Sequence, residues 1–431
     1  MNASASSPPV TPAGVQARDA APSRAERSAS GTSHEASGEK RDARAAASSR
    51  LRVEVLSDSR DEGWPSMDLV SEMLLDQWRT AFARDVDARE LELPIARVAR
   101  RLPALAHRPV AFNVDRIVAR FVSYPARALA SRDGSTLYHV ADHTYAQLVH
   151  VLPSARTGVY CHDLDAFRSL VAGVGHAREP RPAWFRALAR IILRGLQSAA
   201  VVFHSTRAVG DEMVRLGIVD AARLVHAPYG VSPEFDATAR ASDGEALAPI
   251  GARRFVLHVG NALPRKRLDV LFDTFARLRA TDPELRLVQQ GAALSAEQQR
   301  HVREAGISAS LLQPPKLPRA ALAGLYRRAA VVLVPSDAEG FGFPVIEALA
   351  SGAVVVASDI PVLREVGGDA VIYCPPGDAA AWASTVAAVL EGRHAVPSRK
   401  ARLAQAARFT WHAHARTILD AYRRLDDERA R

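Results

Sequence analysis

The chain has 431 residues, of which 48% are hydrophobic and 24% are charged, and this composition is typical of a folded protein with two or three domains. It contains no run of about 18 uncharged apolar residues and begins without an apolar segment, so we expect neither a transmembrane helix nor a secretory signal peptide. The net charge of +9 permits an anionic partner but does not identify one. The two cysteines, Cys161 and Cys374, suggest neither a disulfide framework nor a zinc cluster, which favours a reducing cytoplasm.

Residues 1–50 form the first segment and contain 13 Ala and 10 Ser but no aromatic residue. Such a segment cannot bury enough apolar surface to offset the entropy lost on ordering, so we predict a disordered tail. A dispensable tail and a contact with a membrane or partner both remain open as its role.

Residues 51–240 alternate between short β-branched runs and helical patterns, which predicts a parallel sheet covered by helices. The expected strands are Leu51–Leu56, Thr136–Val140, Gly158–Cys161, Ala200–His204 and Arg223–His226. The expected helices lie near Asp68–Arg84, Asp115–Ala130, Ala183–Gln197 and Ala208–Leu216.

A polar stretch at 241–253 is predicted to be a linker, after which the alternation resumes over 254–408. The expected strands there are Phe255–Val259, Leu285–Val288, Ser308–Leu312, Val331–Val334, Ala353–Ala357 and Val371–Tyr373. The expected helices include Leu268–Arg279, Arg319–Arg328 and Ala379–Leu390, and residues 409–431 form a last helix. The chain is therefore predicted to be α/β, with two Rossmann-like, doubly wound domains facing each other across a cleft, where ligands of such folds bind.

The most informative segment is Ala330–Ser351, which reads AVVLVPSDAEGFGFPVIEALAS. An apolar strand leads into Glu339 and the Gly340-Phe341-Gly342 sequence, and Pro344 opens a helix. The glycines allow close approach of a ligand to the backbone, and free amides at the helix start favour an anion. Glu347 lies one turn into this helix, so the two glutamates bracket its N-terminal end.

This wording, with glutamates eight positions apart, resembles the signature of retaining GT-B glycosyltransferases of family four. The resemblance implies that Glu347 grips the ribose of a nucleotide sugar, that Glu339 lies near the transferred sugar, and that the backbone of Gly340, Phe341 and Gly342 faces the sugar and diphosphate. A carboxylate can accept two hydrogen bonds from a ribose diol, each worth roughly 1.5–3 kcal/mol.

A second segment, Phe255–Asp269 (FVLHVGNALPRKRLD), resembles the element of that family that binds the diphosphate. The resemblance assigns donor binding to Gly260, Arg265 and Lys266. Cations there would stabilise the charge that develops on the departing diphosphate. Positive charge at a helix start opposes the helix dipole, which favours a bound anion over a merely solvated helix end.

The N-terminal half offers polar residues at the ends of expected strands. His162, in GVYCHDLD, resembles the family's histidine near the donor sugar, which implies a catalytic role together with Glu339. Asp142 and His143, in YHVADHTY, are further acceptor-side candidates, as is Gly63, which stands alone where many relatives have a glycine pair. For each polar residue the alternative is a strand-end group satisfied by local hydrogen bonds.

Three other signals are weak. Asp85-Val-Asp87, in a stretch that looks unstructured, and Asp163-Leu-Asp165 match a metal motif of another glycosyltransferase architecture, but two acids at this spacing are common. We expect no metal and no cofactor beyond the nucleotide sugar, and no nucleic-acid module is seen. Arg186, Arg190 and Arg194 form a row opposite Trp184, Leu188, Ile191 and Ile192. We expect this helix to pack on the core with a solvated face; binding to an anionic membrane is the alternative.

The function that the resemblance implies is transfer of a hexose from a nucleotide-diphosphate sugar (GDP- or UDP-linked) to a saccharide or lipid-linked acceptor, with retention of configuration. It implies a metal-independent enzyme of the cytoplasm, in peripheral contact with the inner membrane face and active in envelope or exopolysaccharide synthesis. No pair of carboxylates suited to a double displacement is evident, which favours front-face attack. The alternatives are a nucleotide-sugar epimerase or hydrolase of the same fold, and a non-catalytic scaffold that binds nucleotide sugar.

Overall fold

Two parallel sheets of six strands each organise the chain. The structure, a computed structural model, describes residues 50–102, 108–171, 181–240, 243, 251 and 253–430. The predicted tail 1–50, apart from Arg50, and most of the predicted linker lie outside these residues. The first sheet contains β1 (Leu51–Leu56), β2 (Val86–Leu91), β3 (Leu137–Val140), β4 (Thr157–Cys161), β5 (Val201–His204) and β6 (Leu224–His226). The second contains β7 (Phe255–Val259), β8 (Arg286–Gln290), β9 (Leu311–Leu312), β10 (Val331–Val334), β11 (Val355–Ser358) and β12 (Ile372–Cys374).

The strand order decides where a ligand can bind in each sheet. The first sheet runs β2-β1-β3-β4-β5-β6, and the second runs β12-β11-β10-β7-β8-β9. The order reverses between β1 and β3 in the first sheet and between β7 and β10 in the second. In open parallel sheets, ligands bind outside the carboxyl ends of the strands at such reversals. Leu56 pairs with Val140 at the first reversal and Val332 with Leu257 at the second, so the loops that follow these strands emerge side by side.

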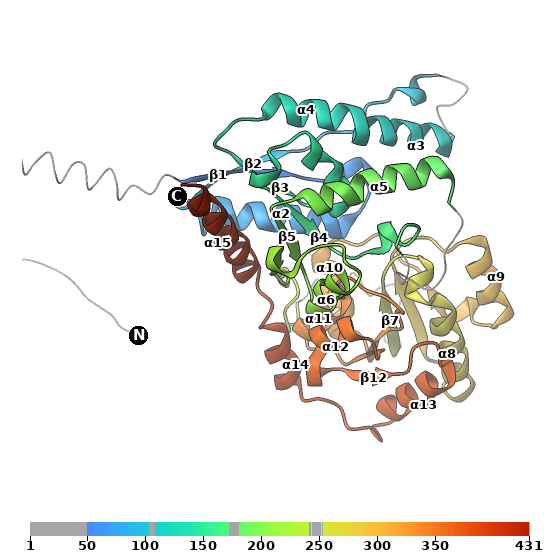
Figure 1. Ribbon diagram of the computed structural model, residues 1–431. Helices are drawn as coiled ribbons and strands as arrows, with labels where there is room; N and C mark the ends of the chain where they lie inside the picture. The colour runs from blue at the N-terminus through green and yellow to red at the C-terminus, as the bar shows by residue number, and fades with distance from the viewer. Residues whose placement is uncertain are drawn as a thin grey trace, which may run out of the picture. The chain divides into compact units, whose positions relative to one another are not determined.

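Helices connect the strands and cover both faces of each sheet (Figure 1). In the N-terminal half they are α2 (Pro65–Arg79), α3 (Pro109–Val118), a π-helical segment (Ala119–Ser123), α4 (Tyr124–Ser131), α5 (Ala183–Ser198) and α6 (Arg207–Arg215). In the C-terminal half they are α8 (Leu268–Thr281), α9 (Ala296–Glu304), α10 (Arg319–Arg328), α11 (Phe343–Ala350), α12 (Pro361–Gly367), α13 (Ala379–Leu390), α14 (Arg399–Ala406) and α15 (Trp411–Ala430). None of these described helices has the length and apolarity needed to span a membrane.

Two sequence-based expectations about the N-terminal half are corrected. The stretch around Asp85 and Asp87 is not unstructured, because β2 begins at Val86 and pairs with β1 along its whole length. It is an edge strand, and its three charged residues, Asp87, Arg89 and Glu90, interrupt the apolar pattern expected of a strand. The helix expected over Asp115–Ala130 consists of three segments, with a π-helical turn between α3 and α4.

The last helix, α15, crosses back to the N-terminal half and packs against α2 (Figure 1). The indole Nε1 of Trp78 donates a 3.0 Å hydrogen bond to the carbonyl oxygen of Ala415. The buried hydroxyl of Tyr422 donates to the carbonyl oxygen of Tyr138 at 3.0 Å and lies 3.0 Å from Nδ1 of His139. One apolar cluster accordingly includes residues of both sheets and of α15.

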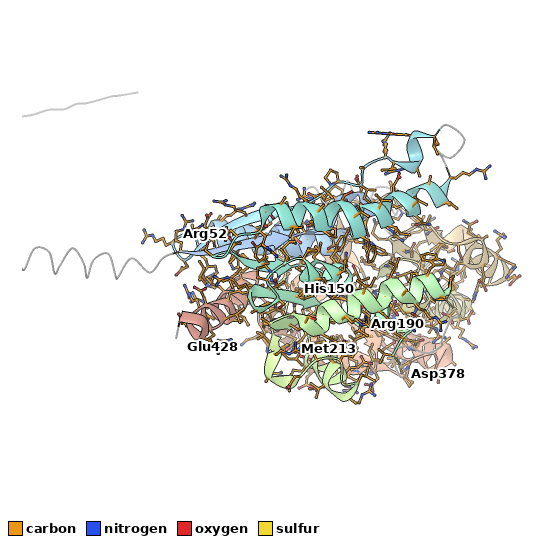
Figure 2. The ribbon with its side chains drawn as sticks, turned by 45° about the horizontal axis from the view of Figure 1, so that its top comes forward. Arg52, His150, Arg190, Met213, Asp378 and Glu428 are labelled. Carbon is orange, nitrogen blue, oxygen red and sulfur yellow. The ribbon has the colours of Figure 1, made fainter. Side chains whose placement is uncertain are left out.

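Helix α5 differs from its expected packing. Ile192 and Leu196 are buried in the apolar cluster between α4, α5, α6 and the first sheet, as the pattern predicts. Trp184 and Ile191, which we expected on the same packed face, are instead exposed by 57% and 39%. Figure 2 shows α5 with Arg190 labelled on it. The expectation of a fully core-packed apolar face is therefore wrong for these two residues.

Candidate active site

The predicted cations and the first glutamate meet at the reversal of the second sheet. Arg265 and Lys266 lie in the short 3-10 turn Pro264–Lys266 after β7, and Glu339 lies in the loop after β10. The Lys266 ammonium lies 2.6 Å from Glu339 Oε1, and Arg265 Nη1 lies 3.3 Å from Glu339 Oε2. Ser336 Oγ donates a further hydrogen bond of 2.7 Å to Oε1. The strand order alone brings these residues together, although the two loops are about 70 residues apart in sequence.

The Glu339 carboxylate is held ionised by these partners. Burial acts to raise its pKa, but Lys266 and Arg265 outweigh this effect and lower the pKa below its ordinary value. Both cations keep unused donors, since Lys266 has three N–H groups and the buried Nε of Arg265 has no partner among the described residues. The pair can therefore bind an additional anion without releasing Glu339.

The loop Gly340–Gly342 presents unused backbone donors beside these cations. The amides of Gly340, Phe341 and Gly342 make no hydrogen bond with any residue that the structure describes. Gly342 has φ 94°, a left-handed conformation that favours glycine, and directly precedes α11. Unpaired amides at a helix start attract anions. The geometry thus supplies both cations and amides at one point.

The same loop touches the N-terminal half. A Cβ added at Gly340 would lie 2.2 Å from the carbonyl oxygen of His162, so a side chain has no room there. The hydroxyl groups of Ser205 and Thr206 both donate to the Gly340 carbonyl oxygen, at 2.9 and 3.2 Å. His162 is thereby placed against the glycine loop, as the sequence predicts for two parts of one site.

His162 belongs to a buried cluster of polar side chains at the carboxyl ends of β3 and β4. Its Nδ1 is hydrogen-bonded to the hydroxyl group of Tyr229, and its backbone amide donates to His143 Nδ1 at 3.4 Å. Burial lowers the pKa of His162, which favours the neutral imidazole. The Nε2 atoms of His162 and His143 are buried and have no partner among the described residues. Two imidazole nitrogens therefore remain available to a substrate.

Asp142 connects this cluster to a second carboxylate, Asp58, which follows β1. Asp142 Oδ1 lies 3.2 Å from His143 Nδ1 and accepts a 2.7 Å hydrogen bond from the amide of Thr144. Burial acts to raise the pKa of Asp142, but His143, His162 and these hydrogen bonds lower it overall. Burial and the neighbouring Asp142 raise the pKa of Asp58 well above its ordinary value. Of these two neighbouring carboxyl groups, Asp58 therefore holds a proton more tightly than Asp142 does.

Glu347 lies apart from the cations. It is buried in α11, where the hydroxyl group of Tyr326 donates a 2.9 Å hydrogen bond to Oε2. Burial raises the pKa of Glu347 to about 7. The carboxylate keeps acceptor capacity for further donors, because Tyr326 occupies one of its lone pairs.

The two remaining predicted glycines have different surroundings. Gly260 lies close to the backbone after β8, since a Cβ added at Gly291 would lie 1.8 Å from the Gly260 carbonyl oxygen. Gly63 has φ 71° in an exposed turn, and no atom lies within 4 Å of its added Cβ. The structure therefore keeps Gly260 beside the donor loops and does not bring Gly63 into contact with the other predicted residues.

A cavity of about 570 Å³ opens between the two halves, beside Arg265 and Glu339. Residues of the β10 and β11 loops form one wall, and the turn after β4 together with α6 forms the other. The second wall is acidic, with Asp163, Asp165, Asp211 and Glu212. Carboxylates accept hydrogen bonds from hydroxyl groups, so this wall is chemically suited to a sugar and the Arg265 side to a phosphate. No group of three or more metal-binding side chains occurs among the described residues.

Several residues that sequence reasoning passed over belong to these networks. Asp58, Tyr229, Ser336 and Tyr326 each contact a predicted residue. Asp58 and Ser336 follow strands directly, so the strand-end rule could have identified them. Tyr229 and Tyr326 are distant in sequence from their partners, and no local pattern marks them.

The family described as "Glycosyl transferases group 1" matches residues 243–428, which contain Arg265, Lys266, Glu339 and Glu347. Residues 243–428 are similar to the glycosyl transferases group 1 family. This match and the relatives below support the expectation of a family-four glycosyltransferase. The matched residues contain the whole second sheet, its helices and most of α15.

Proteins similar to this chain include two D-inositol 3-phosphate glycosyltransferases. The Xylanimonas cellulosilytica protein is 34% identical over 237 residues, covering 51% of this chain and 55% of the relative. The Segniliparus rotundus protein is 31% identical over 288 residues, covering 61% of this chain and 59% of the relative. The matched part thus spans less than two thirds of the length of these relatives.

Solved structures confirm the GT-B arrangement of two Rossmann-like domains. The Anabaena protein HepE in complex with UDP and glucose has a TM-score of 0.64 at 14% identity, covering 86% of this chain and 99% of that chain. Sucrose-phosphate synthase from Thermosynechococcus elongatus has a TM-score of 0.60 at 19% identity, covering 88% and 100%. At these identities the likeness concerns the fold alone.

Proposed function

We propose that the chain transfers a hexose from a nucleotide-diphosphate sugar to a hydroxyl group of a saccharide or lipid-linked acceptor. The observation that carries this proposal is the meeting of Arg265, Lys266 and Glu339 with the unpaired amides of the Gly340–Gly342 loop. The similarity of this region to the glycosyl transferases group 1 family supports it. So do relatives whose names state glycosyl transfer and a structural neighbour that holds UDP and glucose.

In this proposal the cations and amides bind the diphosphate and stabilise its charge as the bond from the anomeric carbon to the phosphate oxygen breaks. The acceptor oxygen forms the new bond to that carbon, and its proton passes to the departing diphosphate. Glu339, in the C-terminal half, and His162, in the N-terminal half, position the hexose between them. Glu347 binds the ribose. No resident metal is required, because Arg265 and Lys266 supply the positive charge.

We further propose that configuration is retained through attack on the same face that the diphosphate leaves. Glu339 is held by two cations and Ser336, which fits an orienting group better than a nucleophile. A double displacement requires a carboxylate nucleophile close to the anomeric carbon. Detection of a covalent glycosyl-enzyme by mass spectrometry would overturn this mechanism, and NMR of the product's anomeric centre tests retention.

Isothermal titration with GDP, UDP and ADP tests the donor site. We expect one nucleotide to bind to the wild type and to lose at least tenfold in affinity with Glu347→Ala, because a ribose diol loses its acceptor. Glu304→Ala, on the exposed surface of α9, serves as the matched control. If none of the three nucleotides binds, the assignment to nucleotide sugars fails. Release of a new nucleotide sugar without any acceptor would instead identify an epimerase.

A further inference from the structure

Helix α5 carries an uncovered apolar surface. Trp184, Phe185 and Ile191 are exposed by 57%, 38% and 39%, and Trp184 and Ile191 are seven positions apart and so share one side of the helix. The rings of Trp184 and Phe185 contact each other edge to face, with centroids 6.0 Å apart. Scattered single exposed residues are ordinary, but large apolar side chains gathered on one helix mark an interaction surface.

The same helix carries unpaired positive charge. Arg186, Arg190 and Arg194 are exposed and form no ion pair with any residue that the structure describes. The sequence of α5, AWFRALARIILRGLQS, contains no acidic residue. Exposed arginines elsewhere commonly have carboxylate partners, as Arg364 has in Asp359 and Arg300 has in Glu304. The charge on α5 is therefore available to a partner.

A second set of exposed apolar residues lies on the same face of the first sheet. Val110 and Val114 of α3 are exposed by 65% and 42%. Residues of α4 and α5 pack in one apolar cluster, so the α3–α4 segment and α5 cover the same face. In both figures the N-terminal ends of α3 and α5 lie at the right-hand end of this face.

The topology relates this end to the candidate active site. Helix α4 leads into β3 and α5 leads into β5, and both strands run parallel to β4. A helix that connects two parallel strands runs antiparallel to them, so α3 and α5 begin near the carboxyl ends of the strands. His162 follows the carboxyl end of β4. Trp184 and Phe185 are exposed and lie in the first turn of α5, so they are at the same end of the N-terminal half as the candidate active site.

We propose that the surface formed by Trp184, Phe185 and Ile191 together with Arg186, Arg190 and Arg194 docks on an anionic lipid membrane. Arginines bind the phosphates of acidic lipids, while Trp and Phe enter the boundary between headgroups and acyl chains. A second copy of this chain fits less well, because a symmetric contact would bring the same unpaired arginines together. Docking in this way brings the carboxyl ends of the strands of the first sheet close to the bilayer. This consequence gives a lipid-linked acceptor a short path to the site and rests on the proposed function; the docking itself does not.

Sedimentation of the full chain with vesicles tests the docking. We expect binding to vesicles of phosphatidylcholine with 30% phosphatidylglycerol, weak binding to phosphatidylcholine alone, and a marked loss of binding at 0.5 M salt. The triple variant Arg186→Gln, Arg190→Gln and Arg194→Gln is expected to lose about a hundredfold in affinity, since each arginine near an anionic surface contributes about fivefold. Trp184→Ser with Phe185→Ser is expected to lose about tenfold.

Matched variants separate this surface from overall charge and from folding. Arg277→Gln, Arg300→Gln and Arg303→Gln remove the same charge from exposed positions of α8 and α9, and Val214→Ser removes an exposed apolar side chain of α6. All are expected to bind vesicles like the wild type, with unchanged melting temperatures. The proposal fails if the wild type does not bind anionic vesicles, if the α8 and α9 variant loses as much as the α5 variant, or if the α5 variants change only the oligomeric state. Nucleotide titration of the same variants should match the wild type, so a failed donor site is distinguished from failed docking.

Discussion

The hydroxyl group of Tyr326 donates a 2.9 Å hydrogen bond to Oε2 of Glu347, and both side chains are buried. A carboxyl group in this position is costly to ionise, and its pKa of about 7 follows from burial. The hydrogen bond from Tyr326 acts in the other direction and favours the carboxylate. The pKa of Glu347, a residue proposed to bind ribose, is thus close to neutral pH.

Stability is expected to depend on pH through Glu347. The folded protein binds this proton more tightly than the unfolded chain does, so the stabilisation is complete below pH 4.5 and is lost as the pH rises to about 7. Glu347→Gln removes the titration, and its free energy of unfolding should therefore fall by about 3 kcal/mol less than that of the wild type between pH 4.5 and 8. Urea unfolding at a series of pH values measures this. Glu304→Gln, at an exposed position of α9, should follow the wild type, and an unchanged slope for Glu347→Gln would contradict the expectation.

The ion pair between Lys266 and Glu339 is expected to support both stability and donor binding. Lys266→Met leaves a buried carboxylate with one cation fewer, which should cost about 3 kcal/mol of unfolding free energy. Addition of Glu339→Gln to this variant should restore much of the stability but not the nucleotide affinity. Calorimetry and nucleotide titration give the two readings, with Lys316→Met on the exposed surface as control. A double variant no more stable than Lys266→Met would show that the pair is not the cause.

Asp58 and Asp142 are expected to respond differently to the same substitution. Asp142→Asn replaces the Oδ2 acceptor of the Thr144 hydroxyl group with an amide donor and removes the charge beside His143, and should cost about 1–3 kcal/mol at pH 7. Asp58→Asn removes a carboxyl group whose pKa is raised by folding, so it should be stabilising at pH 7, because the unfolded wild-type chain gains free energy there by ionising Asp58. Chemical denaturation at pH 7 and pH 9 distinguishes the two variants. Equal losses for both at pH 7 would show that no proton is held on Asp58.

Gly340→Ala is expected to disturb the contact between the two halves. The added Cβ would lie 2.2 Å from the His162 carbonyl oxygen, so the loop must move away from the β4 loop and from Ser205. We expect a lower melting temperature and a large loss of transfer activity. Gly134→Ala, where no atom lies within 4 Å of the added Cβ, is the matched control. Activity close to wild type in Gly340→Ala would mean that the close contact is not needed in the reacting enzyme.

The residues of the candidate site that could be predicted from the sequence are those that lie together in one short segment. Glu339, the Gly340–Gly342 loop and the start of α11 lie within one short segment, so their spacing identified them. Arg265 and Lys266 were found in the same way after β7. Asp58 was overlooked because its environment depends on Asp142, which follows another strand, and Tyr326 was overlooked because only packing brings it to Glu347. Strand β2 was missed because three of its six residues are charged, which hides the apolar pattern of a strand.

The sequence by itself determined the α/β alternation, the apolar strands and the glycine-rich helix start, because hydrophobic periodicity and backbone freedom are properties of neighbouring residues. The tertiary structure alone decided which strand ends meet. Strand order placed the loops of β7 and β10 side by side, so that Lys266 and Glu339 pair, and it placed Gly340 against His162. It also decided that Trp184 is exposed although its helical pattern suggests a packed face, because whether an apolar side is covered depends on elements that are distant in the chain.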